Sequence, residues 1–264
     1  MGVTGPDLVP LGFETDDGFG SRARIGLIVL ESDQTIEAEA RMLDLEGVDI
    51  YHSRIPNAME VTPATLTDME KRLPAAAALL PAAFEFDAIG YGCTSAATLI
   101  GPDGVAAGIG AAHPDVACTN PISAAVAAFR ALGAQRVAVV TPYSAEVTAP
   151  IAEHFAAAGL EVTALGSFLE PSDLVVGLIS PASIASGVHA VTARGECDAV
   201  FVSCTSLRLL GAAADLEAEV DRPVVSSNMA LFWHLLRLAG VVDELPQFGR
   251  LFTCPLSASA ATED

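Results

Sequence analysis

The sequence has few basic residues. Lysine and arginine together number 13 against 33 aspartates and glutamates, which gives the 264-residue chain a formal net charge of −20. A surface of this sign repels phosphate backbones and anionic lipid headgroups over most of the molecule. We therefore expect no nucleic-acid partner and no membrane partner. Gly, Pro or a charged residue interrupts each apolar stretch before about 18 residues, so we also expect no transmembrane helix.

The sequence also lacks the short motifs of metal, nucleotide and hydrolase sites. There is no Cys-x-x-Cys pair and no His-x-x-x-His spacing, so we expect no metal. A phosphate-binding Gly-x-x-x-x-Gly-Lys-Ser/Thr segment, a Gly-x-Gly-x-x-Gly directly after a strand and a Gly-x-Ser-x-Gly elbow are absent as well. We therefore expect no nucleotide cofactor and disfavour a serine hydrolase. The five cysteines and the N-terminal composition predict a cytoplasmic protein without a signal peptide.

The sequence does contain a large apolar fraction, arranged in alternating patterns. Hydrophobic residues make up 52% of the chain, enough for the core of one or two compact domains. Short strand-like runs alternate with segments of helical period. The predicted strands and the helices that follow them are 25–30 with 35–43, 88–91 with 101–111, 137–140 with 146–157, 199–202 with 208–220, and 224–225 with 228–238. This alternation is typical of an α/β fold built on buried parallel sheets.

The second half of the body weakly repeats the first. Ile25-Gly-Leu-Ile-Val resembles Val137-Ala-Val-Val-Thr, and Gly92-Cys93-Thr94-Ser95 resembles Ser203-Cys204-Thr205-Ser206 at nearly the same offset. We therefore predict two pseudo-symmetric domains, each a parallel sheet flanked by helices, with the active site in the cleft between them. The predicted parts are a flexible arm at 1–22, a first domain at 23–121 plus 227–252, a second domain at 122–226, and a tail at 253–264.

Each half carries a Cys-Thr-Ser tripeptide where a predicted strand ends. In open α/β domains, ligands bind beyond the carboxyl ends of the strands, where backbone N–H groups of the next helix converge. A cysteine there is expected to have a lowered pKa, and the adjacent N–H groups and hydroxyls to hold a carboxylate or enolate oxygen. Cys93 and Cys204 are therefore the candidate catalytic pair. The alternative is that they are ordinary small buried side chains.

Several motifs, taken in order, resemble one superfamily. They are Gly26-Leu-Ile-Val29, Asp33-Gln-Thr35-Ile-Glu37, Gly90-Tyr-Gly-Cys93-Thr94-Ser95, Thr119-Asn-Pro121, Val139-Val-Thr-Pro-Tyr143, Ser203-Cys204-Thr205 and Pro223-Val-Val-Ser-Ser227. Their order and spacing, over nearly all of the body, resemble the Asp/Glu racemase superfamily. Within it, the chain is similar to the branch of maleate cis-trans isomerases and arylmalonate decarboxylases, together with the racemase-like proteins of ectoine-utilisation operons.

The resemblance implies a cofactor-independent enzyme in which one cysteine from each domain faces a small carboxylate substrate. Cys93 and Cys204 match those two positions. In the family, hydroxyls and amides after the first cysteine hold a carboxylate, and the tyrosine of a Thr-Pro-Tyr segment donates a further hydrogen bond. The predicted substrate-binding positions are Thr94, Ser95, Tyr143, Thr205 and Ser206. Decarboxylases of this branch have glycine in place of the first cysteine, so Cys93 argues for isomerase chemistry.

Two positions depart from the maleate isomerase pattern, which has asparagines near the places of Asp33 and Asp173. A carboxylate there repels a substrate carboxylate but gains a charge-assisted hydrogen bond from a substrate ammonium. We therefore predict that both aspartates bind substrate. The alternative is local, with Asp33 capping the helix that follows it and Asp173 acting as a turn residue.

The residues leave three functional hypotheses open. The two aspartates favour an amino-acid racemase or epimerase of the ectoine-utilisation type, in which one thiolate removes the α-proton and the opposite thiol returns a proton. In a maleate cis-trans isomerase, one cysteine instead adds to the double bond. The third hypothesis is a non-catalytic small-ligand-binding protein, because a fold alone does not determine function. The expected partners are a small carboxylate or amino acid and, in a homo-oligomer, further copies of the chain.

Overall fold

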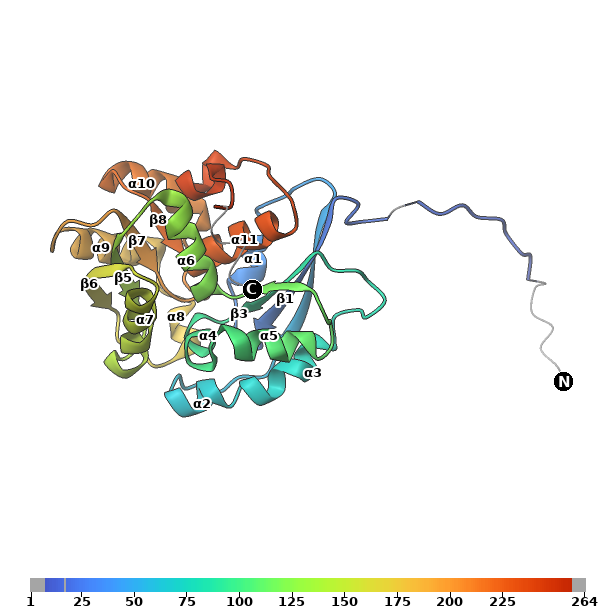
Figure 1. Ribbon diagram of the computed structural model, residues 1–264, viewed down its shortest axis with the longest axis horizontal. Coiled ribbons are helices and arrows are strands. Elements are labelled where there is room, and N and C mark those ends of the chain that lie inside the picture. Colours follow the sequence, from blue (N-terminus) through green and yellow to red (C-terminus); the bar gives the residue numbers. More distant parts are fainter. Residues whose placement is uncertain (1–7, 17, 258–264) are drawn as a thin grey trace.

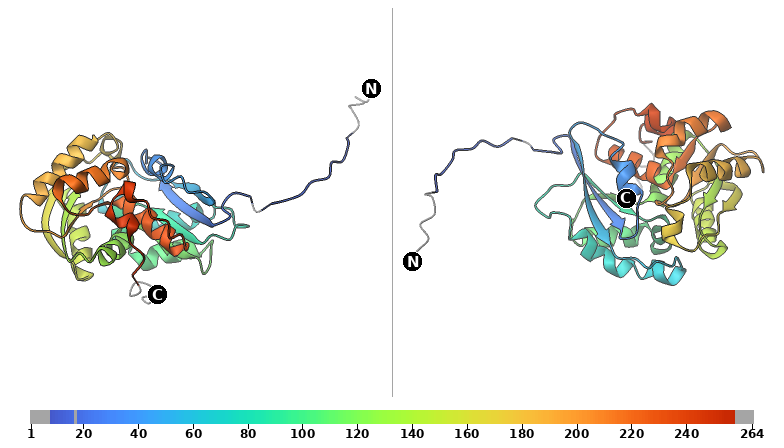
Figure 2. Two further views of the ribbon diagram at one scale, coloured as in Figure 1. Left: turned by 90° about the horizontal axis from the view of Figure 1, so that it is seen from above. Right: turned by 180° about the vertical axis from the view of Figure 1, so that it is seen from behind.

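The computed structural model describes residues 8–16 and 18–257, and its body is built on two separate parallel sheets (Figure 1). Residues 8–16 and 18–21 run away from the body without helix or strand, and Leu8, Phe13 and Phe19 in this segment are exposed, whereas the Arg22 N–H donates to the Gly47 carbonyl of the body at 2.8 Å. Figure 2 shows the same segment leaving the body in two further views. The rest of the predicted arm and the end of the predicted tail, at 1–7, 17 and 258–264, lie outside the described residues.

The first sheet contains four parallel strands in the order β2-β1-β3-β4. The strands are β1 (Ala23–Leu30), β2 (Val48–Ile55), β3 (Ala88–Gly92) and β4 (Ala117–Thr119). All five residues of β3 are buried, as is typical of a central strand with helices over both faces. β2 lies at the edge and pairs only with β1 among the described strands. Its partly exposed position accommodates polar residues such as Asp49 and His52.

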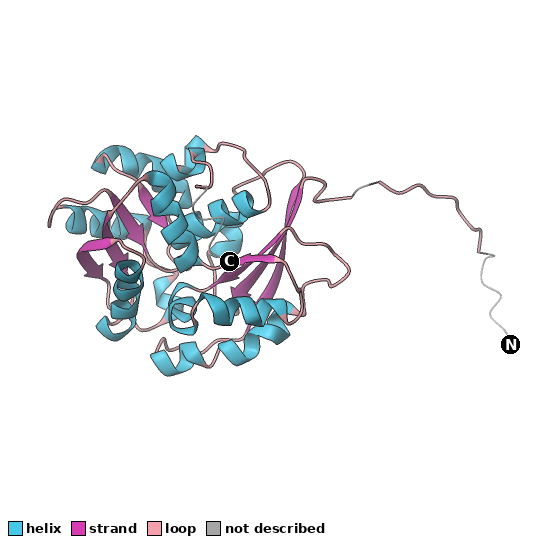
Figure 3. Cartoon of the chain, viewed as in Figure 1, coloured by secondary structure: helices cyan, strands magenta, loops and turns pink. Residues whose placement is uncertain are grey.

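The second sheet repeats this topology. Its strands, in the order β6-β5-β7-β8, are β5 (Arg136–Thr141), β6 (Glu161–Ser167), β7 (Ala199–Val202) and β8 (Val224–Ser226), and all of them run parallel. The order therefore matches that of the first sheet, strand for strand. Figure 3 shows the two sheets as separate groups of strands with helices around each. The predicted α/β class, with two pseudo-symmetric sheets flanked by helices, is confirmed.

The helices cover the faces of the two sheets. They are α1 (Ile36–Ala40), α2 (Pro63–Thr67), α3 (Leu73–Ala77), α4 (Thr94–Ile100), α5 (Pro102–Gly110), α6 (Pro121–Leu132), α7 (Ala145–Ala157), α8 (Asp173–Val176), α9 (Pro181–Thr192), α10 (Ala213–Val220) and α11 (Ser227–Leu238). Short 3-10 turns lie at Glu70–Arg72, Leu210–Ala212, Pro246–Phe248 and Arg250–Thr253. Among the described residues, none of the helices is long and apolar enough to cross a membrane.

The last helix, α11, packs on the first sheet although it follows the second. It contacts β3, β4 and α6. Gly90 permits this close approach, because a Cβ at that position would lie 2.9 Å from Leu235 Cδ1. This packing of α11 on the first sheet is consistent with the prediction that residues 227–252 belong to the first domain. The domain boundaries stay a prediction.

The observed elements differ from the predicted ones at short helices and at sheet edges. The helix expected after the first tripeptide is placed by its pattern at 101–111, yet a separate helix, α4, begins directly after Cys93 and ends before Gly101 and Pro102. The edge strands β2 and β6 are also unpredicted, since their exposed side chains interrupt the apolar pattern. The predicted helix at 35–43 is only five residues long in the structure.

Candidate active site

The two cysteines of the repeated tripeptide line one cavity. Cys93 directly follows β3, and Cys204 comes two residues after β7, the corresponding strand of the second sheet. The described residues that line the cavity are Leu30, Asn57, Ala58, Glu60, Val61, Thr65, Leu66, Met69, Cys93, Thr94, Ser95, Tyr143, Asp173, Cys204 and Thr205. The carboxyl ends of parallel strands are where ligands bind in such sheets, and here both sheets contribute to a single site.

Most of the predicted site residues reach this cavity. The Tyr143 hydroxyl, after β5, lies close to both Cys204 and Ser95. Ser206 does not line the cavity, and its contact with substrate stays a prediction. Its N–H donates to Cys204 Sγ at 3.4 Å, and its carbonyl accepts a hydrogen bond from Thr35 Oγ1 at 2.9 Å. Ser206 therefore contacts the Cys204 sulfur through its backbone N–H, from outside the cavity wall.

The two aspartates are buried beside the cysteines, Asp33 at 4% exposure and Asp173 at 5%. Asp33 Oδ1 accepts hydrogen bonds from the N–H groups of Thr35 at 2.7 Å and Ile36 at 2.8 Å, so Asp33 does cap α1, as the local alternative predicts. Asp173 is the first residue of α8 and lines the cavity, where it accepts a hydrogen bond from Ser32 Oγ. Only Asp173 of the pair thus forms part of the wall, and contact of either with substrate stays a prediction.

Burial raises the pKa of both thiols, so the lowered pKa expected for a thiol at a helix N-terminus is wrong here. The pKa of Cys93 is raised to about 11, and that of Cys204 is raised further, in both cases mainly because the sulfur is removed from water. Nearby hydrogen-bond donors oppose the shift without cancelling it, and the charges of Asp33 and Asp173 add to it. Both thiols are therefore protonated at neutral pH in the closed cavity.

The backbone at Cys204 is strained. Its φ of +118° lies in a region that favours glycine and that a residue with a Cβ occupies only at a cost. Cys93, at the corresponding position, has an extended φ of −146°. The Cys204 N–H donates to Ser227 Oγ at 3.0 Å, and the preceding Ser203 N–H donates to the Val140 carbonyl at 2.8 Å. These bonds hold the strained residue at the cavity wall.

A third buried carboxylate, that of Glu39, joins α1 to the loop after Cys204. Glu39 Oε1 accepts hydrogen bonds from the N–H groups of Leu209 at 2.8 Å and Leu210 at 2.9 Å. Glu39 Oε2 accepts one from Asn228 Nδ2 at 2.8 Å, and the same amide donates to the Thr205 carbonyl at 2.8 Å. Burial raises the pKa of Glu39 despite these bonds. This network is not predictable from the sequence, because nothing in the local pattern links residues so far apart.

A short strand pairing borders the cavity. Glu60 and Ser172 form an antiparallel bridge, and the Asp173 N–H donates to the Met59 carbonyl at 3.4 Å. The free volume of the cavity is about 20 Å³, which is room for roughly one water molecule.

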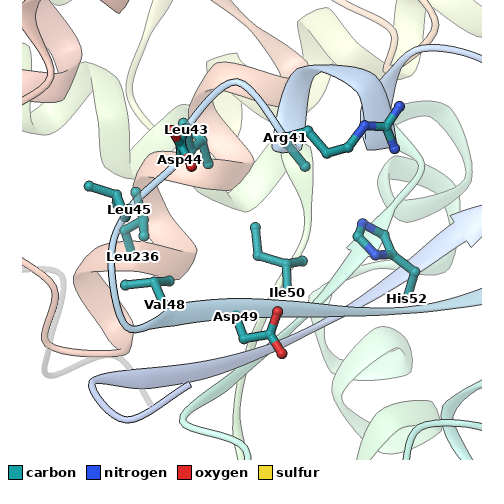
Figure 4. A pocket seen from close by; sticks show the side chains of 10 residues that line it. Arg41, Leu43, Asp44, Leu45, Val48, Asp49, Ile50, His52 and Leu236 are labelled. Carbon is teal, nitrogen blue, oxygen red and sulfur yellow. The ribbon is translucent and has the colours of Figure 1, made fainter. Parts of the chain in front are cut away.

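A larger hollow lies beside the edge strand β2, on the side facing the loop after α1 (Figure 4). The side chains that line it are Ala40, Arg41, Leu43, Asp44, Leu45, Val48, Asp49, Ile50, His52 and Leu236. These walls include no cysteine and no predicted site residue. The candidate active site is therefore the cavity lined by Cys93 and Cys204 and not this hollow. Among the described residues, no group of three or more His, Cys, Asp or Glu side chains is arranged to hold a metal ion.

A model of the arylmalonate decarboxylase family matches residues 105–252, more than half of the chain. The chain belongs to this family. Maleate isomerase of Geobacillus stearothermophilus is 26% identical over 247 residues, which cover 87% of this chain and 97% of that protein. Arylmalonate decarboxylase of Bordetella bronchiseptica is 34% identical over 137 residues, which cover 51% of this chain and 57% of that protein.

Solved structures of similar proteins match this family member over most of its length. Maleate isomerase Iso from Pseudomonas putida S16 has 26% identity and a TM-score of 0.79, with 88% of this chain and 98% of that chain covered. A Cys-to-Ala variant of Iso with maleate has 25% identity and a TM-score of 0.78, with 88% and 97% covered. Unliganded arylmalonate decarboxylase has 26% identity and a TM-score of 0.69, with 87% and 98% covered.

The family and these similarities confirm the predicted resemblance to this branch. They identify the protein as an enzyme of the cysteine-based isomerase type. Maleate isomerases of Geobacillus stearothermophilus and Pseudomonas putida match over 97% of their own length, whereas the sequence match to arylmalonate decarboxylase covers 57% of that protein, so the maleate isomerase alternative fits better than the favoured amino-acid racemase.

One hydroxyl connects the two cysteine loops of this family member. Ser227, the first residue of α11, is fully buried, and its Oγ accepts hydrogen bonds from the Cys204 N–H at 3.0 Å and from Thr94 Oγ1 at 2.7 Å. Ser227 is not among the predicted site residues. Its position could have identified it, because Ser227 directly follows the last strand, β8, and ends the motif Pro223-Val-Val-Ser-Ser227.

Ser227→Ala is expected to lower kcat by about tenfold or more with little change in KM, because the loss of the shared acceptor lets both cysteine loops shift. Steady-state kinetics of the wild type and the variant measure the effect. Ser226→Ala is the matched control, since Ser226 Oγ caps α11 by accepting from the Met229 N–H at 3.1 Å. That variant should lose about 1 kcal/mol of stability but keep its turnover. Equal turnover in the two variants would show that the Ser227 bridge is only structural.

Proposed function

We propose that this protein is a cis-trans isomerase of the maleate isomerase type, acting on a small cis-unsaturated carboxylate. The observation that carries the proposal is the single closed cavity lined by Cys93, Cys204 and the hydroxyls of Thr94, Ser95 and Tyr143. A thiol that can add reversibly to a carbon–carbon double bond, next to donors for a carboxylate, is what such a reaction needs. The maleate isomerases among the relatives support the same reaction.

Cys93 is the proposed nucleophile. Burial raises its pKa less than that of Cys204, so its sulfur is the easier of the two to deprotonate. The sulfur forms a bond to one carbon of the double bond, the π electrons move onto the substrate carboxylate, and the thiol proton passes to a carboxylate oxygen. The new single bond then rotates. The proton returns to sulfur as the C–S bond breaks and the double bond re-forms in the trans geometry.

The hydroxyls and the second cysteine have supporting roles in this proposal. Thr94 and Ser95 hold the carboxylate that takes up charge, and the Tyr143 hydroxyl, which interacts with Ser95 and Cys204, stabilises that charge as it develops. Cys204 has the more strongly raised pKa and stays protonated. It donates a hydrogen bond from the opposite side of the substrate.

An amino-acid racemase is the second candidate function, and the two buried aspartates are the observation that favours it. Asp33 and Asp173 lie close enough to both cysteines to raise the pKa of each thiol. Carboxylates in that position suit a substrate ammonium. In this alternative, both cysteines transfer protons at the α-carbon, one on each face.

One experiment separates the two candidates. The enzyme is incubated in deuterated water with maleate, with its monoamide, and with D- and L-amino acids, and the products are followed by proton NMR. We expect conversion of a cis alkene to its trans isomer without deuterium on carbon, and no change in the amino acids. Racemisation of an amino acid with deuterium at its α-carbon would identify the racemase instead. Binding without either reaction would favour a non-catalytic ligand-binding protein.

A further inference from the structure

The charge of the cavity is unusual for a site that takes carboxylates. The residues that line it in the described part of the chain include Asp173 and, at the exposed rim, Glu60, but no lysine, arginine or histidine. Asp33 lies just behind the wall. The guanidinium of Arg54 is committed elsewhere, because it donates to the carbonyls of the last β1 residue, Glu31 and Asp33 and pairs with Glu37 at 2.9 Å. A substrate with two carboxylates would therefore meet negative charge without a neutralising cation.

The two buried aspartates retain unused acceptor capacity. Asp33 Oδ1 is occupied by two backbone N–H groups, but its Oδ2 is buried and accepts no hydrogen bond in the described structure. The Thr205 hydroxyl, a group of the cavity wall, lies next to the Asp33 carboxylate. Asp173, among the described residues, accepts a side-chain hydrogen bond only from Ser32. A buried carboxylate oxygen without a donor is costly, so this end of the cavity favours a ligand that supplies N–H groups.

We propose that the natural substrate carries a single carboxylate and, at its other end, an N–H-donating group, a primary amide or an ammonium, that binds Asp173 and is attracted by the charge of Asp33 behind the wall. The inference rests on the proposed function, because it takes this cavity as the substrate site. The carboxylate lies against the hydroxyls of Thr94, Ser95 and Tyr143, and the N–H group lies at Asp173. A charge-assisted hydrogen bond then replaces the repulsion that a second carboxylate would suffer.

Binding of unreactive analogues tests this directly. Succinate, succinamate and 4-aminobutyrate have no double bond, and they differ in carrying a carboxylate, an amide or an ammonium at the second end. Calorimetry with the wild type should show succinamate or 4-aminobutyrate binding about tenfold or more tightly than succinate. The stronger of these two ligands identifies which N–H group the site prefers. Turnover of maleate and of its monoamide is measured alongside.

Asp173→Asn should shift the ratio of N–H ligand to succinate affinity toward succinate by about tenfold, because it removes one buried negative charge and keeps the shape. Asp33→Asn is the second variant and keeps the cap on α1, since an asparagine oxygen also accepts from backbone N–H groups. Glu31→Gln is the matched control. It removes the same charge from an exposed position just after β1, outside the cavity wall, and should leave the ratio unchanged.

Succinate binding as tightly as the N–H ligands, or an affinity ratio that Asp173→Asn and Asp33→Asn do not move, would overturn the inference. These results are separable from the proposed function because the binding ratio needs no turnover. Isomerisation of maleate together with a preference for succinate would support the function and refute the inference. A clear preference for an N–H ligand without isomerisation of any alkene would support the inference and refute the function.

Discussion

Replacing Cys93 with serine is expected to reduce cis-to-trans turnover by about a thousandfold or more. A serine hydroxyl has nearly the shape of the thiol, but it is much less acidic and a poorer leaving group. Both the addition to the double bond and the elimination are therefore slowed. Substrate affinity should change little, because the carboxylate-binding hydroxyls remain in place. Proton NMR of the cis and trans alkenes gives the rate, and calorimetry with succinamate gives the affinity.

Cys118→Ser is the matched control for this prediction. Cys118 lies on β4, is partly exposed and does not line the cavity. The same change of sulfur to oxygen there should leave turnover close to that of the wild type. If Cys93→Ser kept comparable turnover, Cys93 would not be the nucleophile and the covalent-addition mechanism would fail at its first step.

At Cys204, substitution by glycine is expected to give a more stable protein than substitution by alanine, by about 1 kcal/mol, although both variants should lose nearly all turnover. Both changes remove the thiol. Glycine also removes the Cβ that is strained at a φ of +118°, whereas alanine keeps it. Denaturant unfolding of the two variants gives the difference in the free energy of unfolding, and the NMR assay gives the loss of turnover.

The corresponding position in the first half provides the comparison. Cys93 has an extended φ of −146°, so the ordinary order should hold there, with alanine more stable than glycine by about 0.5–1 kcal/mol. An inverted order at Cys204 alone would show that strain at the second cysteine is maintained at the expense of stability. Alanine more stable than glycine at both positions would contradict the strain argument.

The locations of the two cysteines were predictable because β3 and β7 lie inside their sheets. Both strands are fully buried, so their apolar runs are continuous and the tripeptide after each is easy to place. The edge strands β2 and β6 have one neighbour each, and their exposed side chains hide them from the same analysis. The bridged segments around Glu60 and Ser172 follow these edge strands, so no local pattern indicated them.

By itself, the sequence determined the α/β class, the repeat and the pair of candidate thiols, because these depend on residues close together in the chain. The tertiary structure decided the direction of the thiol pKa shifts, the capping role of Asp33 and the Ser227 bridge between the cysteine loops. Each of these depends on contacts between distant segments. The pKa of a thiol follows from how much of both halves surrounds the sulfur and excludes water, and no local spacing of residues encodes that burial.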